Sequence, residues 1–215
     1  MRNGDFAILA TLILVASATT ARAETMVSHF KIKGNTVTAT FQATDPDDPC
    51  IEFFVNVVAS DSVEKTSPPK SKVAVPRTVL IVILRYTCTD TLLFSSLGDS
   101  FSQGLQVAGD LRSATLKTTV TTADALSLQL YDFDMDLTWT GTGPAVHQNT
   151  KETFRDRDLG IFIKSHTKGV TVPAEAVGTV VGTSVGLEGN VTPEPSVDAE
   201  IQRRDDSTLT IEKTM

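Results

Sequence analysis

One row of acidic residues in this chain has a spacing that could serve metal chemistry. Asp132, Asp134 and Asp136, the acidic row, alternate with apolar residues, so on a β-strand their carboxylates project to one face. Steps of about 6.8 Å along that face are too long for all three to hold one calcium ion, unless the strand bulges. Two of them could bind calcium with one further carboxylate, from Asp45, Asp47, Asp48, Asp156 or Asp158. The alternative is a solvated face whose like charges keep an edge strand from pairing.

The segment from Gly182 to Gly186 (GTSVG) has the literal pattern of a serine-hydrolase nucleophile elbow. Such an elbow needs a strand, a sharp turn and a helix, with an acid and a histidine after the serine. Here Pro193 and Pro195 follow Ser184 without helical periodicity, and the last histidine, His166, comes before it. The context disfavours an elbow, so we assign no catalytic residue. A secreted hydrolase stays as an alternative that needs His, Asp and Ser residues to converge on folding.

Three glycines of the same region share one face of a strand. Gly178, Gly182 and Gly186 are four residues apart, which leaves a flat surface without bulk. One interpretation is the close approach of another backbone or of a large ring such as Trp139. The other is a shallow ligand face, on which Trp139 or Tyr131 stacks against a sugar. The sequence leaves both open.

Two apolar runs form the centre of the chain, Cys50–Ala59 and Arg77–Cys88. Both are rich in Val, Ile, Leu and Phe and each follows a proline, which favours buried strands over helices. We predict an antiparallel pair with a disulfide between Cys50 and Cys88, with Val58 opposite Leu80. Residues 60–76 would be a polar connecting loop. The alternative is a pair of buried free thiols.

The remaining patterns are also those of strands. Residues 28–33 and 36–41 flank Gly34-Asn35, which predicts a hairpin. Alternation from Tyr131 to Trp139 predicts a half-buried strand, residues 145–158 look like a long loop, and residues 199–203 and 208–212 like a terminal hairpin. Helical periodicity is absent after residue 24. We therefore predict an all-β fold, an antiparallel two-sheet β-sandwich with one disulfide.

The segment Asp136–Pro144 (DLTWTGTGP) carries a resemblance to other proteins. Together with the glycine- and threonine-rich stretch after it and the ending from Glu200 to Ile211, it is similar to a group of uncharacterised secreted bacterial β-proteins. The resemblance covers the C-terminal part of the chain. It implies a secreted bacterial protein and implies no site residues.

The N-terminus has the pattern of a signal peptide over residues 1–23. Arg2 precedes an apolar stretch, Ala7–Ala18, and Ala21-Arg22-Ala23 fits the small-x-small pattern of a cleavage site. We expect cleavage before Glu24, a single domain over residues 24–215, and an extracellular or periplasmic location, where a disulfide persists. The apolar stretch is too short for a membrane span, and no later stretch reaches about twenty apolar residues.

Charge narrows the choice of partner. The formal net charge is −7, and an acidic balance argues against nucleic acid or an anionic membrane. The sequence shows no obvious basic patch. We expect a non-catalytic binding module at or outside the cell surface, with a protein or glycan as its partner. The alternatives are a calcium-dependent adhesion or glycan-binding module and the hydrolase named above.

Overall fold

The fold is made of long antiparallel strands. The computed structural model describes residues 25–214 apart from 46, 157–158, 185–188 and 193, so the expected signal peptide over residues 1–23 lies outside the described residues. The strands are β1 (Thr25–Thr44), β2 (Ile51–Ser67), β3 (Ser71–Tyr86), β4 (Thr91–Ser100), β5 (Leu105–Val107), β6 (Ser113–Asp124), β7 (Leu130–Gly141), β8 (Val146–Asp156), β9 (Ile161–Gly182), β10 (Gly189–Asn190) and β11 (Asp198–Thr214). The predicted all-β antiparallel class is confirmed. Within the described part of the chain, no helix is long and apolar enough to cross a membrane.

The ladders join these strands into one continuous sheet that returns to its start. β1, β2, β3, β4, β6, β7, β9 and β11 each pair with the next, and β11 pairs with β1. β5 lies beside β6, whereas β8 and β10 lie beside β9. The predicted division into two sheets is therefore not confirmed.

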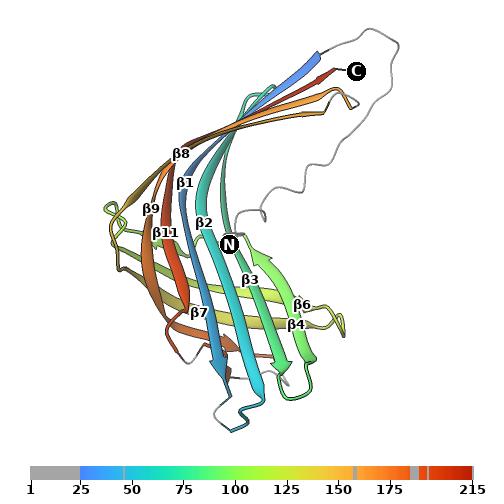
Figure 1. Cartoon of the computed structure of the whole chain (residues 1–215), viewed down its shortest axis with the longest axis vertical. Coiled ribbons are helices and arrows are strands. Elements are labelled where there is room, and N and C mark those ends of the chain that lie inside the picture. The colour runs from blue at the N-terminus through green and yellow to red at the C-terminus, as the bar shows by residue number, and fades with distance from the viewer. Residues whose placement is uncertain (1–24, 46, 157–158, 185–188, 193, 215) are drawn as a thin grey trace.

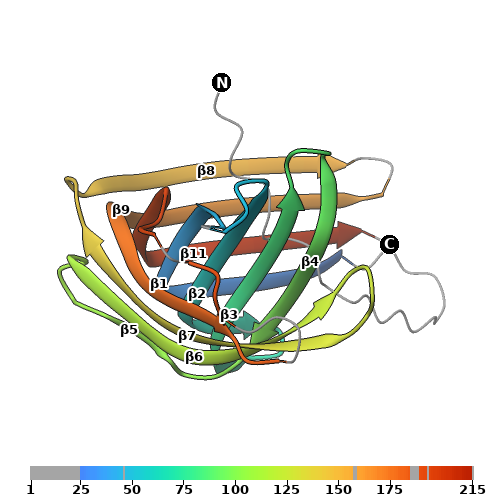
Figure 2. The same ribbon diagram turned by 90° about the horizontal axis from the view of Figure 1, so that it is seen from below.

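The lower part of the molecule holds the core. There β6 and β7 cross over β1–β3 (Figure 2), and the alternation predicted from Tyr131 to Trp139 is confirmed. Phe133, Met135, Leu137 and Trp139 are at most 2% exposed. The indole Nε1 of Trp139 donates a hydrogen bond of 2.7 Å to the carbonyl of Thr38. This bond links β7 to β1 across the core.

The two central strands and their disulfide are confirmed, but their predicted register is wrong by one residue. Cys50 and Cys88 are bonded, with their Cα atoms 5.3 Å apart. The ladder pairs Val57, and not Val58, with Leu80. Both cysteines lie in turns outside the ladder, so their bond does not define a cross-strand pair. The difference matters because a shift of one residue in the pairing would place every side chain of one strand on the opposite face of the sheet.

The predicted hairpin around Gly34-Asn35 is also wrong. β1 runs straight through both residues and pairs with β2 on one side and β11 on the other. A Cβ added to Gly34 would lie 2.6 Å from the Cα of Ser62 in β2. Glycine is thus required here by the close approach of two backbones, and not by a turn.

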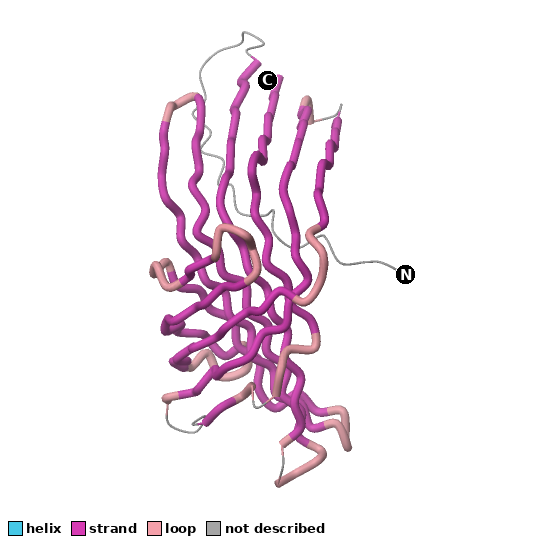
Figure 3. The backbone as a smooth tube through the Cα atoms, turned by 90° about the vertical axis from the view of Figure 1, so that its left-hand side faces the viewer, coloured by secondary structure: helices cyan, strands magenta, loops and turns pink. Residues whose placement is uncertain are grey.

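Three stretches expected to be loops or turns are strands. β2 and β3 occupy residues 60–76 except for the turn at 68–70, and β8 occupies most of 145–158. The expected terminal hairpin is one strand, β11, with a bulge between Arg204 and Asp206. These stretches extend six strands, in the order β8-β9-β11-β1-β2-β3, beyond β4, β6 and β7 (Figures 1 and 3). We call this extension the arm (residues 25–35, 61–76, 146–156, 161–169 and 205–214) and the remainder the body.

Candidate binding surface

The arm has two faces, and the ladder register shows which one continues the core side of the body. Val37 of β1 faces the core, and because β1 carries no bulge, Lys33 and Lys31 face the same side. In β11 the core-facing residue is Ile201, and the bulge brings Asp206 to that side. We call this side the inner face and the opposite one the outer face.

Basic side chains gather on the inner face. Eight Lys and Arg residues from five strands lie there: Lys31, Lys33, Lys65, Lys72, Lys151, Arg155, Lys164 and Lys168. His29, His147 and His166 lie among them, and the acidic residues of this face are Asp61, Asp206 and Glu212. Asp205, at the bulge of β11, pairs with Arg203 at 3.0 Å. On the outer face the charged residues are Glu64, Glu152, Asp156 and Lys213. The ladders thus sort cations to one side of the arm.

Most of these cations are turned to solvent. Among the described residues of the inner face, Lys31 alone forms an ion pair, with Nζ 3.0 Å from Oδ2 of Asp206. The hydrogen bond from Lys31 lowers the pKa of Asp206, and the positive charges of Lys33 and His166 act in the same direction. Lys164 lies over the ring of Phe162, with Nζ 4.8 Å from the ring centroid. The other basic side chains remain available to a partner.

Charge is also divided between arm and body. Among the described residues, the arm carries ten Lys and Arg against seven Asp and Glu, whereas the body carries six against fifteen. The chain therefore has a basic end and an acidic end, although its overall charge is negative. The expectation that it has no basic patch is wrong for the inner face.

The outer face of the arm is the more apolar one. Phe30, Ile32 and Ile163 are half-buried there, and Phe154 and Val73 are 57% and 54% exposed. In the body the inner side of these strands is apolar, whereas in the arm the inner side is basic and the outer side is the more apolar one. Burying the inner-face cations without partners would be costly, and β4, β6 and β7 end before this face.

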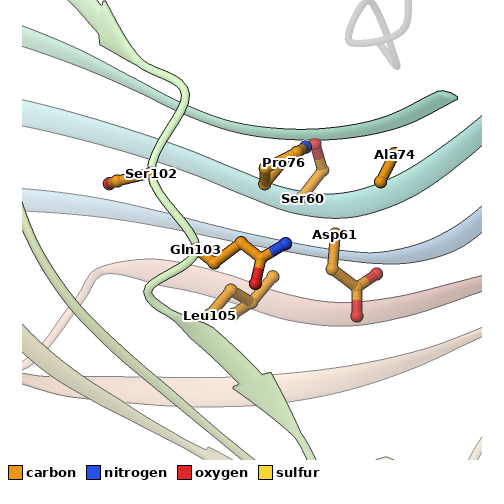
Figure 4. Close-up of a pocket in the computed structure, with 7 residues that line it drawn as sticks. All are labelled: Ser60, Asp61, Ala74, Pro76, Ser102, Gln103 and Leu105. Carbon is orange, nitrogen blue, oxygen red and sulfur yellow. The ribbon is translucent and has the colours of Figure 1, made fainter.

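A shallow pocket lies where the inner face meets the body. It has a volume of about 230 Å³ and is lined by Ser60, Asp61, Ala74, Pro76, Ser102, Gln103 and Leu105 (Figure 4). Both carboxylate oxygens of Asp61 accept hydrogen bonds from Asn35, one from its backbone N–H and one from its side-chain Nδ2. Asp61 is thus held by β1 and is not a free ligand.

The acidic row lies on the outer face of β7, exposed to solvent. The hydroxyls of Thr121 and Thr119 donate hydrogen bonds of 2.6 Å to Asp132 and Asp134, and Lys117 pairs with Asp136 at 3.1 Å. Each carboxylate thus has its own donor on β6. Among the described residues, no three His, Cys, Asp or Glu side chains are grouped so as to hold a metal ion, and Asp158 lies outside them.

The structure separates the two aromatic residues of the expected ligand face. Trp139 is 0% exposed in the core and so presents no surface for a sugar to stack on. Tyr131 is half-buried and packs edge-to-face on Phe94, with ring centroids 5.1 Å apart. Neither ring is free for the stacking that was considered for them.

The glycine row agrees with the close-approach interpretation at Gly178. A Cβ there would lie 2.1 Å from the carbonyl oxygen of Asp136, in the neighbouring strand β7. Gly182 is buried beside Phe133 at the end of the same ladder. Gly186 lies outside the described residues.

The serine and histidine residues are not brought together as a catalytic set. The hydroxyl oxygen of Ser184 accepts a hydrogen bond of 2.8 Å from the backbone N–H of Asp132, in the body. His29 and His166 lie in the arm, where their partners are Thr210 and Asn149. The geometry of these residues provides no acid–base pair for the serine.

Sequence reasoning missed the basic inner face. The sequence does show basic residues at every second position in two stretches. These are Lys31 and Lys33 in one, and Lys164, His166 and Lys168 in the other. The two stretches are far apart in the sequence, and β11 joins them only through the ladders.

No protein-family model, curated protein or solved structure matches this chain.

Proposed function

We propose that this protein is a non-catalytic binding module of an oxidising, extracytoplasmic space, and that it holds an acidic protein surface against the inner face of its arm. The observation that carries the proposal is the gathering of eight Lys and Arg residues on that face. Complementary charge guides such partners together and gives specificity. The Cys50–Cys88 disulfide supports the oxidising location, and with it export and removal of residues 1–23.

An acidic protein suits this surface better than a nucleic acid does. Among its described residues the body carries fifteen acidic residues against six basic ones, so a long polyanion that ran past the arm would meet repulsion. A compact acidic protein can contact the arm alone. We further propose that the body packs as two layers, in the manner of a sandwich, and the hydrogen bond from Trp139 to Thr38 across the core supports this.

The test is binding of fluorescently labelled poly-L-glutamate to the oxidised protein. We expect binding at about 50 mM salt that weakens at least tenfold at about 500 mM, because screening shortens the range of the charges. Reversing two inner-face charges, Lys164→Glu with Lys168→Glu, should weaken binding markedly, because the excess of positive charge on this face falls by four. Lys213→Glu, on the outer face of the same arm, is the matched control and should leave it unchanged.

Two results would overturn the proposal. One is equal affinity of the reversed variant and the wild-type protein for poly-L-glutamate. The other is tighter binding of a DNA duplex than of poly-L-glutamate at the same salt, which would make nucleic acid the partner.

A further inference from the structure

The acidic partner can be sought in the chain itself, because the molecule carries both signs of charge on separate surfaces. The basic inner face belongs to the arm, and the acidic row lies on the outer face of β7 in the body. Within one molecule the arm extends away from the outer face of β7 (Figures 1 and 2). These two surfaces can therefore meet only between molecules.

The outer face of β6 and β7 is polar and exposed. Beyond Leu130 at the start of the strand, the alternate residues of β7 that share this face are the acidic row, Thr138 and Thr140, and Glu175 of β9 lies opposite Thr140. Lys117 is the basic residue paired to this row, and its side chain and that of Asp136 are 83% and 63% exposed. An exposed ion pair of this kind is weak and can be exchanged for one with another molecule.

The two surfaces also repeat at the same interval. The acidic row occupies alternate residues of one strand, and so do Lys31 with Lys33 on β1 and Lys164, His166 and Lys168 on β9. Alternate residues of a strand are about 6.8 Å apart on either surface. Two such strands laid face to face can place several opposite charges in register at once.

We propose that a second copy of this chain is the acidic partner, with the inner face of one arm docked on the outer face of β6 and β7 of the next molecule. The proposal rests on the function proposed above and names its partner. The contact joins two different surfaces, so it is heterologous, and each molecule keeps one free arm and one free acidic face. Association therefore continues head to tail, into chains whose length grows with concentration.

The experiment is sedimentation velocity of the oxidised protein over a range of concentration at about 20 mM and about 500 mM salt. We expect concentration-dependent association at low salt and monomers at high salt. Two variants reverse the charges on either side of the contact: Lys164→Glu with Lys168→Glu in the arm, and Asp132→Lys with Asp134→Lys in the body. The body variant should be monomeric, because its arm and its altered face are then both basic, and the arm variant should associate far more weakly, because its inner face loses most of its excess of positive charge.

Mixing the two variants is the decisive measurement. The mixture should associate again at low salt, because the unaltered arm of the body variant meets the unaltered acidic face of the arm variant. Lys213→Glu, on the outer face of the arm, is the control and should associate like the wild type. Far-UV circular dichroism and a thermal melt establish that each variant is folded.

The inference is overturned if the wild type stays monomeric at low salt, if the body variant still associates alone, or if the mixture does not associate. Its failure is distinguishable from failure of the proposed function. A wild-type protein that binds poly-L-glutamate but stays monomeric at low salt would leave the function standing, with another acidic protein as the partner. Loss of both would overturn the two together.

Discussion

Replacing Trp139 by Phe tests how the body is held together. Trp139 is fully buried, and its Nε1 donates to the carbonyl of Thr38 across the core. Phenylalanine removes this hydrogen bond, at a cost of about 1–2 kcal/mol. The smaller ring also leaves a void, which costs about 1–2 kcal/mol more. We expect the free energy of unfolding to fall by about 3 kcal/mol, which for a chain of this length lowers Tm by roughly 6–12 °C.

The assay is urea unfolding and a thermal melt followed by far-UV circular dichroism. Fluorescence cannot follow the variant, because Trp139 is the single tryptophan of the chain. In the wild type, however, it makes acrylamide quenching a clean measure of burial, and we expect weak quenching. Tyr131→Phe is the control: its hydroxyl donates to the side-chain oxygen of Gln129 at an exposed site, so its loss should cost less than about 0.5 kcal/mol.

The reasoning would be refuted by a Tm change below about 2 °C in the Trp139→Phe variant with an unchanged urea slope. It would also be refuted if acrylamide quenched the wild-type protein as readily as free tryptophan. Either result would mean that β7 and β1 do not meet across the core as described.

Three other changes probe the backbone, the disulfide and acid stability. Gly178→Ala should destabilise the fold by about 2–4 kcal/mol in urea unfolding, because its Cβ would meet a backbone carbonyl and its φ is +136°, whereas Gly109→Ala, with open space around it, should change little. Replacing Cys50 and Cys88 by Ser removes a link between residues 38 apart and should cost about 4 kcal/mol in the chain-entropy model, seen as a lower Tm than that of the oxidised wild type; equal melts would contradict this. The pKa of Asp206 is lowered in the fold, so its carboxylate stabilises the protein above the ordinary carboxyl pKa of about 3.9 and loses this effect as the pH falls through the lowered value. Asp206→Asn should therefore melt below the wild type at neutral pH, with the difference vanishing in acid, and a difference that grew in acid would reverse the assigned sign.

The body was largely predictable from the sequence because its strands bury one face. Alternation from Tyr131 to Trp139 identified β7 and its core side, and the two apolar runs identified β2 and β3 together with their disulfide. Each of these signals depends on apolar side chains leaving water, which any strand of a buried sheet must show.

The arm was missed for the same physical reason. Residues 60–76 and 146–156 are exposed or half-buried on both faces, apart from Ser62, so no apolar periodicity distinguishes them from loops. Gly34 also reads as a turn residue, although in the fold it makes room for Ser62 of the neighbouring strand. Only the pairing with distant strands makes these segments regular.

The sequence by itself determined that lysines alternate with apolar residues, as at Phe30 to Lys33. It could not determine which of the two sets points inward, because a period of two is symmetric with respect to the faces. The tertiary structure decided this through the unbroken register of β1 and the bulge in β11. The lysines of five strands thereby share one face, and the candidate binding surface exists only because of that register.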